Sequence, residues 1–588
     1  MNEEAKSIWK KSWHGLGAFF ILALSAAAVV FLVAFIYALT NWEKPVADTF
    51  TKAALAGFIF ATCCLFAGCF VFLLRWMFWT HWRLGLFTLA CLATLIALFY
   101  AEEDWRGWHA WNQFKHQWEA KGEKFDWQSI VPPPVPDDQN FALTPIVFTS
   151  YGQMLTRDGK LIPYKNRDTN FVNRLKMDIV HNYEDSPKDG NWEIAKISDL
   201  ETWRNYYRAL VAKTNEFPVQ PQPQSPAADV LLALSKYDPA IEELRQVSQS
   251  PYSRFPLDYD TENPSEILLP HLATLKQCSL ALQLRAIAEL QNNQPGKALD
   301  DIKLALQLTD KIHTEPFLIS HLVRIAMLQI TLQPIYEGLA AHQCSEEQLV
   351  ALDTELAKLD FLADYKLSMR GEMGLQGGNI DYLIRNRREL FNMTSENGTS
   401  SGPLFISSLI PTGWFYQNRF GCARMMVEFY IPLANVNQQT ISPAAVRQAD
   451  KALQAETKII TAYNILERML LPGLGNVVKK FAYAQSSVNL ARVAIALERY
   501  RLAHGEYPES LDALAPQFME RIPQDIIGGQ PLHYRLTADG QFVLYSVGWN
   551  EKDDGGVVVD QKSRDPRDES GNPPDISQGD WVWRYPTK

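Results

Sequence analysis

Cysteine is scarce in this sequence, and its spacing excludes several kinds of site. Seven cysteines occur among 588 residues, and no two of them form a Cys-x-x-Cys pair. Thiol-redox centres and zinc knuckles therefore lack their usual ligand spacing. Four cysteines lie in apolar stretches near the N-terminus, so only Cys278, Cys344 and Cys422 remain for the rest of the chain, too few for a disulfide scaffold.

The sequence also lacks the short motifs that identify common enzyme classes. It has no Walker A loop, no Gly-x-Gly-x-x-Gly fingerprint, no His-Glu-x-x-His pair and no Gly-x-Ser-x-Gly elbow in a fitting context. Acidic residues outnumber basic ones, 66 to 56, which gives a net charge of −10. No general phosphate-neutralising surface results, so we expect no nucleic-acid partner. The hydrophobic content of 47% excludes a disordered chain.

Long apolar runs are present, and all of them lie in the first hundred residues. Residues 16–39, 53–74 and 84–100 each form a run without a charged side chain. A helix crosses a hydrocarbon core of roughly 30 Å with about 20 apolar residues. Tryptophans cluster at the ends of the runs, as they do at membrane–water interfaces. The sequence therefore predicts three transmembrane helices, and the first run is too long for the h-region of a signal peptide.

Basic residues near the three runs predict the orientation of the chain. One side carries five of them, namely Lys6, Lys10, Lys11, Arg75 and Arg83. The opposite side carries Lys44 and Lys52, followed by three acids at 102–104. By the positive-inside rule the N-terminus lies in the cytoplasm and the chain after residue 104 is extracytoplasmic. The lipid bilayer is thus the first predicted partner.

Beyond residue 104 the patterning predicts three further parts. Residues 105–226 hold an exit helix, a proline-rich spacer and a mixed α+β segment. Residues 227–475 follow a 3.6-residue apolar period, which predicts helical hairpins. Residues 476–588 combine a long helix with a β-hairpin at an Asp-Gly turn. The predicted fold is a membrane-anchored, mainly α chain: three N-terminal transmembrane helices in 1–104, a helical-hairpin outer region and a small α+β C-terminal module.

Within the helical part, one segment has the pattern of a known repeat. Apolar residues recur at three and four positions through 272–312, and the stretch 292–296 interrupts them, so two antiparallel helices are expected. The segment LRAIAELQNNQPGKALDDIKLALQL resembles a single tetratricopeptide unit. Further helices are expected over 316–339 and 345–359, the second with a capping box that starts at Ser345.

Four segments of the C-terminal part share a pattern with a known family. They read ALERYRLAHGEYPESLDAL, IPQDIIGGQPLHYRL, FVLYSVGWN and DISQGDW. Together they resemble the soluble domain of type II secretion major pseudopilins, although here the helix lies far from the apolar runs. The chain, with its segment EAKGEKFDWQSIVPPPVPDDQNFALTP, also resembles a family of uncharacterised bacterial membrane proteins. The resemblance implies a multi-pass protein of the bacterial inner membrane with a periplasmic domain.

The pseudopilin resemblance also implies a calcium site in the loop after the hairpin, where that family binds Ca²⁺. The resemblance reaches this loop through Val547, Asn550 and Asp575, and Asp553 lies in the same acidic stretch. Ca²⁺ takes about six to eight oxygen ligands in a flexible loop, and residues 550–580 hold seven aspartates. Asn550 stands where the family usually has an aspartate, and basic residues partly neutralise the acids. A solvated acidic tail is the alternative.

Three histidines are candidate metal ligands. His313 and His321 are eight positions apart on expected helical segments and could share a face, and His342 follows further on. A metal cluster needs carboxylates or cysteines that converge with them. Structural histidines are the preferred interpretation.

A few other side chains could carry chemistry. The adjacent acids at 242–243 and 300–301 point apart on a helix, so solvated faces are expected for both pairs. Trp414, Gln417 and Asn418 would suit a ligand pocket, but packing explains the tryptophan equally well. Neither set identifies a reaction.

Three functions remain compatible with the sequence. The favoured one is a non-enzymatic, membrane-anchored extracytoplasmic scaffold or interaction protein that binds a protein or peptide partner. The pseudopilin-like module supports an alternative, a component of an envelope secretion or pilus-like apparatus. The third is a hydrolase with dispersed catalytic residues, which would need a nucleophile and a base within hydrogen-bond reach.

Overall fold

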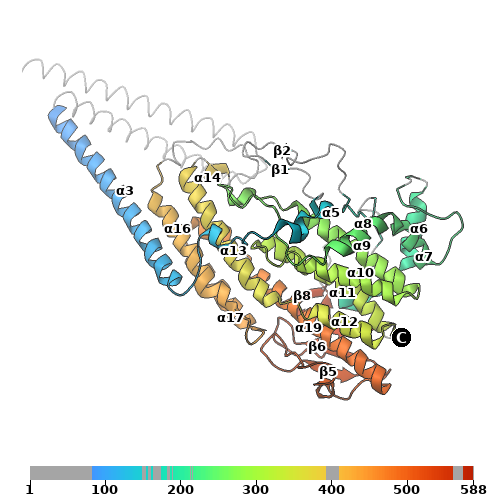
Figure 1. Ribbon diagram of the computed structural model, residues 1–588. Helices are drawn as coiled ribbons and strands as arrows, with labels where there is room; N and C mark the ends of the chain where they lie inside the picture. Colours follow the sequence, from blue (N-terminus) through green and yellow to red (C-terminus); the bar gives the residue numbers. More distant parts are fainter. Residues whose placement is uncertain are drawn as a thin grey trace, which may run out of the picture. The chain divides into compact units, whose positions relative to one another are not determined.

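The computed structural model describes residues 82–148, 154–155, 161–162, 174–181, 186–187, 190–211, 213–214, 216–387, 389–392, 409–560 and 574–586 (Figure 1). The first two predicted transmembrane helices lie outside the described residues, as do parts of the mixed segment between residues 149 and 189. The chain divides into two compact units, residues 1–105 and residues 106–588.

In the first unit the described part is the beginning of helix α3 (Trp82–Glu119). The helix predicted over 84–100 is therefore confirmed, and it continues beyond that run. Its large apolar side chains are solvent-exposed, with exposed fractions from 48% at Phe99 to 64% at Leu95. By length and composition α3 is one of two helices in the described part of the chain that could span a membrane.

The second such helix is α11 (Leu318–Ala340), and it lies in the core of the second unit. Of its most apolar 18-residue window, 61% is buried, against 6% for the window in α3. It packs against α9 (Pro270–Gln291), α10 (Pro295–Asp310), α13 (Phe361–Arg385) and α19 (Leu474–His504). Burial within the protein thus accounts for the apolar character of α11.

The second unit is mainly helical with a small C-terminal sheet region, as the sequence predicts. The other α-helices in its described part are α4 (Trp127–Ile130), α5 (Pro145–Phe148), α6 (Leu200–Leu210), α7 (Pro226–Leu234), α8 (Asp238–Val247), α12 (Glu346–Leu356), α14 (Glu389–Asn392), α16 (Thr412–Arg424), α17 (Pro443–Glu456) and α18 (Ile465–Leu470). The predicted domain boundaries within 105–588 stay predictions.

The predicted hairpin over 272–312 is confirmed as α9 and α10. The turn between them places Asn293 at a φ of 54°, and the Gln294 amide donates to the Glu289 carbonyl at 2.8 Å. The next predicted helix start is also confirmed, because the Ser345 side chain and the Gln348 side chain form a reciprocal capping box at α12. Such a box satisfies two amide groups that would otherwise lack partners at the helix start.

α19 is the helix around which the C-terminal part is built. It begins at Leu474 and ends at His504, where Gly505 at a φ of 89° terminates it, and it is the long helix predicted at the start of residues 476–588. Side chains on all of its faces are buried between Leu474 and Glu498. Helices α11, α12, α13 and α17 contact it, and so do strands of the sheet (Figure 1).

The sheet region consists of short antiparallel strands. Strands β5 (His533–Leu536), β6 (Phe542–Ser546) and β9 (Trp581–Arg584) form one sheet in the order β5-β6-β9. The predicted hairpin is confirmed as β5 and β6, with Leu536 opposite Phe542. The other strands among the described residues form three two-stranded pairs: β1 (Met154–Leu155) with β2 (Leu161–Ile162), β3 (Ala434–Asn435) with β4 (Thr440–Ile441), and β7 (Val558–Asp560) with β8 (Pro574–Gly579).

A buried carboxylate joins α19 to the turn that follows α11. Glu498 is fully buried, and its oxygens accept hydrogen bonds from Arg501 at 2.7 and 2.9 Å and from the Tyr507 hydroxyl at 2.9 Å. His342 Nδ1 lies 3.1 Å from the same carboxylate. Burial opposes ionisation of Glu498, but the hydrogen bonds from Arg501 and His342 outweigh it and lower its pKa below the ordinary 4.5.

We expect Glu498→Gln to destabilise the folded chain by about 1–3 kcal/mol at neutral pH, because it removes hydrogen bonds to a charged acceptor. A lowered pKa in the folded state contributes stability that is present above pH 4.5 and is lost as the pH falls through the folded pKa. Thermal unfolding of both proteins from pH 7 to pH 3 measures this. The difference between them should shrink below about pH 4.5, and a pH-independent difference would contradict the ionic role.

Candidate functional site

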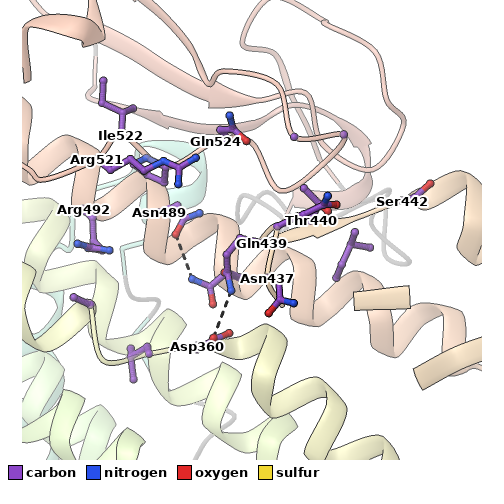
Figure 2. Close-up of a pocket in the computed structure, with 18 residues that line it drawn as sticks. Asp360, Asn437, Gln439, Thr440, Ser442, Asn489, Arg492, Arg521, Ile522 and Gln524 are labelled. Carbon is purple, nitrogen blue, oxygen red and sulfur yellow. Dashed lines mark hydrogen bonds between the residues drawn. The ribbon is translucent and has the colours of Figure 1, made fainter. Parts of the chain in front are cut away.

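A groove of about 770 Å³ with a polar lining lies in the second unit (Figure 2). Four segments far apart in the sequence form it: residues 357–360, the β3–β4 hairpin at 437–442, the middle of α19, and the loop 521–529. Six amide side chains line it, namely Asn437, Gln438, Gln439, Gln485, Asn489 and Gln524. We refer to this cavity as the amide groove.

One wall of the amide groove is a polar stripe on α19. Gln485, Asn489 and Arg492 are spaced by four and three residues, so they lie on one face of the helix. Arg492 is held in place because its Nε donates to Asp353 Oδ1 at 2.7 Å. The stripe interrupts the otherwise apolar surface of α19.

Asn489 presents an amide donor to the groove. The residue is only 7% exposed, and its Oδ1 accepts a hydrogen bond from Gln485 Nε2 at 3.2 Å. Gln485 Oε1 in turn accepts from the Phe361 amide at 2.7 Å, so the orientation of both side chains is fixed. Among the described residues no acceptor is found for Asn489 Nδ2. A ligand oxygen in the groove would satisfy that donor.

The β3–β4 hairpin forms the second wall. Gln439 adopts a φ of 51°, and its Nε2 donates to the Val436 carbonyl at 2.9 Å and to Asp360 Oδ2 at 3.4 Å. Asp360 is the N-cap of α13 and accepts from the Leu362 and Ala363 amides. The carboxylate at the groove therefore already serves the start of a helix.

The loop 521–529 forms the third wall, and a buried aspartate holds it. Asp525 is 1% exposed, and its Oδ1 accepts from the Ile527 amide at 2.9 Å and from the Ser546 hydroxyl at 2.7 Å. Its Oδ2 accepts from the Val547 amide at 3.0 Å. Burial raises the pKa of Asp525, and these hydrogen bonds oppose the rise. The loop is thereby tied to the end of β6.

Arg521 and Gln524 extend from this loop beside Asn489 (Figure 2). Both are solvent-exposed. No described carboxylate pairs with Arg521, so its guanidinium is available to an anionic group of a ligand. Guanidinium donors match the geometry of a carboxylate.

The amide groove combines groups that both donate and accept hydrogen bonds. An amide side chain offers two N–H donors and a carbonyl acceptor, which are the groups that a peptide backbone needs on both of its edges. The hydroxyls of Thr440 and Ser442 add further groups of this kind. The arrangement suits the binding of an extended, polar chain that carries a carboxylate.

Each of the four residues of the predicted calcium site has a hydrogen-bond partner of its own. The Val547 amide binds Asp525, and Asn550 Nδ2 donates to Asp554 Oδ2 at 2.7 Å. Asp553 accepts from the Tyr545 hydroxyl at 3.0 Å, and Asp575 accepts from the Ser577 amide at 3.0 Å. Asp565 and Asp568 of the acidic loop lie outside the described residues. Among those described, no group of three metal-ligating side chains is found, and the calcium site stays a prediction.

The three histidines have separate surroundings. His313 lies in the turn after α10 and His321 in α11, so the suggested common helix face is wrong. His321 is fully buried with its Nε2 2.8 Å from the Glu315 carbonyl, and burial lowers its pKa to about 3. His342 binds Glu498, as described above. These contacts favour structural roles.

A buried serine, glutamate and histidine test the hydrolase hypothesis. Ser320 Oγ donates to Glu315, whose second oxygen lies 2.6 Å from His271 Nε2. All three are at most 1% exposed. The carboxylate stands between the hydroxyl and the imidazole, so the histidine cannot take the serine proton as it does in a catalytic triad. The group stabilises the packing of α9 against α11.

The prediction of a solvated face is wrong for Asp301. This residue is fully buried, and it binds Arg245 at 2.8 Å and Arg285 at 2.9 Å. Nearby Glu289 is also buried, and burial together with Asp301 raises its pKa to about 8. The cluster holds α8, α9 and α10 together, because a buried acid requires paired partners.

Asn418 connects α16 to the residues around the start of α18. Its Nδ2 donates to the Trp414 carbonyl at 2.8 Å and to the Ala462 carbonyl at 2.7 Å, while its Oδ1 accepts from the Leu466 amide at 2.8 Å. These hydrogen bonds hold α16 against α18. They favour packing over a ligand pocket as the role of Asn418.

Sequence reasoning missed the amide groove. The available signal was the polar stripe Gln485, Asn489 and Arg492 in a helix assigned by its apolar positions. The other walls come from turns, whose spatial neighbours have no local signature in the sequence. The groove therefore becomes visible only when the four segments are placed together.

We expect Asp525→Asn to loosen the loop 521–529. Three groups now donate hydrogen bonds to the Asp525 carboxylate, and the amide nitrogen of asparagine would face one of these donors without accepting its hydrogen bond. An unpaired buried donor costs about 1–3 kcal/mol, so the midpoint of urea unfolding should fall. Asp512→Asn is the matched control, since Asp512 is exposed and a surface change is typically within about 0.5 kcal/mol. Equal stability of the two variants would exclude this role of Asp525.

Comparison of the chain with models of protein families, with curated proteins and with solved structures finds no match. The resemblances seen in short segments therefore stay resemblances. The function has to be argued from the geometry of the described residues.

Proposed function

We propose that this protein is a membrane-anchored binding protein whose outer domain takes an extended peptide in the amide groove. The single observation that carries the proposal is the groove itself: six amide side chains and Arg521 converge there from three segments. A peptide ligand would be a segment of a partner protein. Catalysis is not required by this arrangement.

The apolar part of α3 supports the membrane anchor. Nine large apolar side chains between Leu84 and Phe99 are 48–64% exposed. Exposure of apolar surface to water costs about 25 cal/mol per Å², so a lipid environment suits this stretch better than water. The two further apolar runs at 16–39 and 53–74 supply the rest of the proposed anchor.

The hydrogen-bonding character of the groove supports a peptide ligand. Asn489 Nδ2 would donate to a backbone carbonyl, and the exposed amides Asn437 and Gln524 would bind backbone groups on either side. Arg521 would pair with a carboxylate of the peptide. Among the lining residues no aromatic ring offers a stacking surface for a sugar, so a peptide is favoured over a glycan.

The peptide proposal predicts a specific loss of binding. A random peptide library displayed on phage and selected on the full chain in nanodiscs should yield acidic peptides. Arg521→Gln should weaken such a peptide roughly tenfold or more, since a hydrogen bond to a charged group contributes about 1.5–3 kcal/mol. Isothermal titration calorimetry measures the affinity.

Arg535→Gln is the control for this experiment, because Arg535 is exposed on β5 and does not line the groove. It removes the same charge and should leave the affinity unchanged. Asn437→Ala, at an exposed position of the groove, should weaken the peptide without altering the melting temperature. Selected peptides that bind all variants equally, or a glycan array that gives the binders instead, would contradict the proposal.

Orientation is a separate part of the proposal, and it rests on the count of basic residues around the apolar runs. We expect the chain after residue 104 to be extracytoplasmic. An alkaline-phosphatase fusion at Pro134 should therefore be active, and a cytoplasmic reporter at the same position inactive. The opposite pattern would place the groove in the cytoplasm and invert the topology.

A further inference from the structure

A buried carboxyl group on α18 lies against the backbone of α16. Glu467 is only 3% exposed, and its Oε1 has no hydrogen-bond partner among the described residues. Its Oε2 packs so tightly on α16 that a Cβ added to Gly421 would lie 2.5 Å from it. A carboxylate buried in this way loses its hydration, and the unpartnered Oε1 would bear that cost uncompensated. The neutral, protonated form of Glu467 therefore fits the site better than the ionised form.

A second acid, Glu456, lies beside Glu467. It is the last residue of α17 and forms a hydrogen bond with Glu467. Two carboxyl groups can form such a bond only when one of them carries a proton. Arg424 of α16 donates to Glu456 Oε2 and so compensates the charge of that acid. Burial and the charge of Glu456 raise the pKa of Glu467 to about 7, while Arg424 opposes the rise.

The other titratable or charged side chains around the two acids have surroundings of their own. The Cys422 thiol of α16 is buried, and burial together with Glu467 raises its pKa, so the thiol stays neutral. Arg468 of α18 donates to the Thr457 carbonyl at 3.1 Å, and Lys458 is exposed in the loop after α17. The charge at this contact between α16, α17 and α18 therefore varies with pH through the pair of acids.

Little else buries α18 in the fold. Of its six residues, only Leu466 and Glu467 are buried. The helix packs on α16, where the Leu466 amide donates to Asn418 Oδ1 at 2.8 Å. A segment with few buried side chains opens at a lower free-energy cost than the whole domain. One ionisation within so small a contact is therefore enough to change the fraction of molecules in which α18 is open.

We infer that Glu456 and Glu467 form a proton-operated latch, which holds α18 against α16 while Glu467 is protonated and loosens it when Glu467 ionises. In the open state Glu467 is hydrated and returns to its ordinary pKa of 4.5. Because its pKa is higher in the closed state, the closed state is fully stabilised below pH 4.5, and this stabilisation is lost as the pH rises through about 7. The inference depends neither on the amide groove nor on the membrane anchor.

Hydrogen exchange of the full chain in nanodiscs tests the latch. The reporting amides are those of residues 465–471, among them the Leu466 amide that donates to Asn418. Mass spectrometry follows their exchange at about pH 5 and about pH 8, on either side of the expected transition. Each rate is divided by the intrinsic rate at the same pH, which gives a protection factor. The amides of α12 serve as the reference segment.

Two variants separate the latch from a general effect of charge. Glu467→Gln keeps a hydrogen-bonding side chain of the same size but cannot ionise. Glu428→Gln is the matched control, because Glu428 is an exposed acid that follows α16. In the native chain and in Glu428→Gln, the protection of residues 465–471 should fall roughly tenfold or more from pH 5 to pH 8, since one unit of pKa corresponds to a factor of ten. In Glu467→Gln it should not fall.

Four results would overturn the inference: equal protection at both pH values in the native chain, a fall that persists in Glu467→Gln, a fall that both variants abolish, and a fall that α12 shares. If Glu467→Gln leaves residues 465–471 unprotected at both pH values, Glu456→Gln decides the question. That variant removes the neighbouring charge, so a smaller fall supports the latch, and an unchanged fall excludes it.

Discussion

Helix α19 has buried side chains on every face, and this imposes the architecture of the surrounding chain. A helix whose side chains are mostly apolar on every face cannot lie on a surface, because about 25 cal/mol is lost for each Å² of apolar area left in water. It must be enclosed. Helices α11, α12, α13 and α17 enclose it together with strands β6, β8 and β9. Segments more than 300 residues apart, such as Trp192 and Trp583 with ring centres 5.3 Å apart, meet in the layers around it.

Enclosing a helix that carries polar residues creates a second constraint, because each buried polar group needs a partner. Glu498 meets this demand with Arg501, Tyr507 and His342. Gln485 meets it with the Phe361 amide, and this bond places the start of α13 beside α19. Asn489 meets it at Oδ1, which accepts from Gln485 Nε2, and the residue lines the amide groove, where its Nδ2 is open to solvent or to a ligand oxygen. The rule that fixes the core near Glu498 thus applies to only one end of the Asn489 amide.

The elements that local signals define were predictable from the sequence. A capping residue marks the start of α12 at Ser345, and Gly505 marks the end of α19. The Asp-Gly turn marks the β5–β6 hairpin. What failed depends on spatial neighbours. The local sequence predicts that Asp301 lies on a solvated helix face. Its burial depends on ion pairs with Arg245 and Arg285, which come from other helices or turns of the fold. The amide groove was missed for the same reason, since three of its walls are turns.

Helix α13 relates the amide groove to α16 and α18 within the second unit. Asp360, at the start of α13, lines the groove, whereas Asp381 near the other end pairs with Arg419 of α16. These acids are 21 residues apart in the sequence, which is about 30 Å along a helix. Helix α16 in turn packs on α18. Sites more than about 10 Å apart that share no partner usually contribute independently to stability. A substitution at Asp381 would therefore loosen the contact with α16 while the start of α13, which Asp360 caps at the groove, keeps its hydrogen bonds.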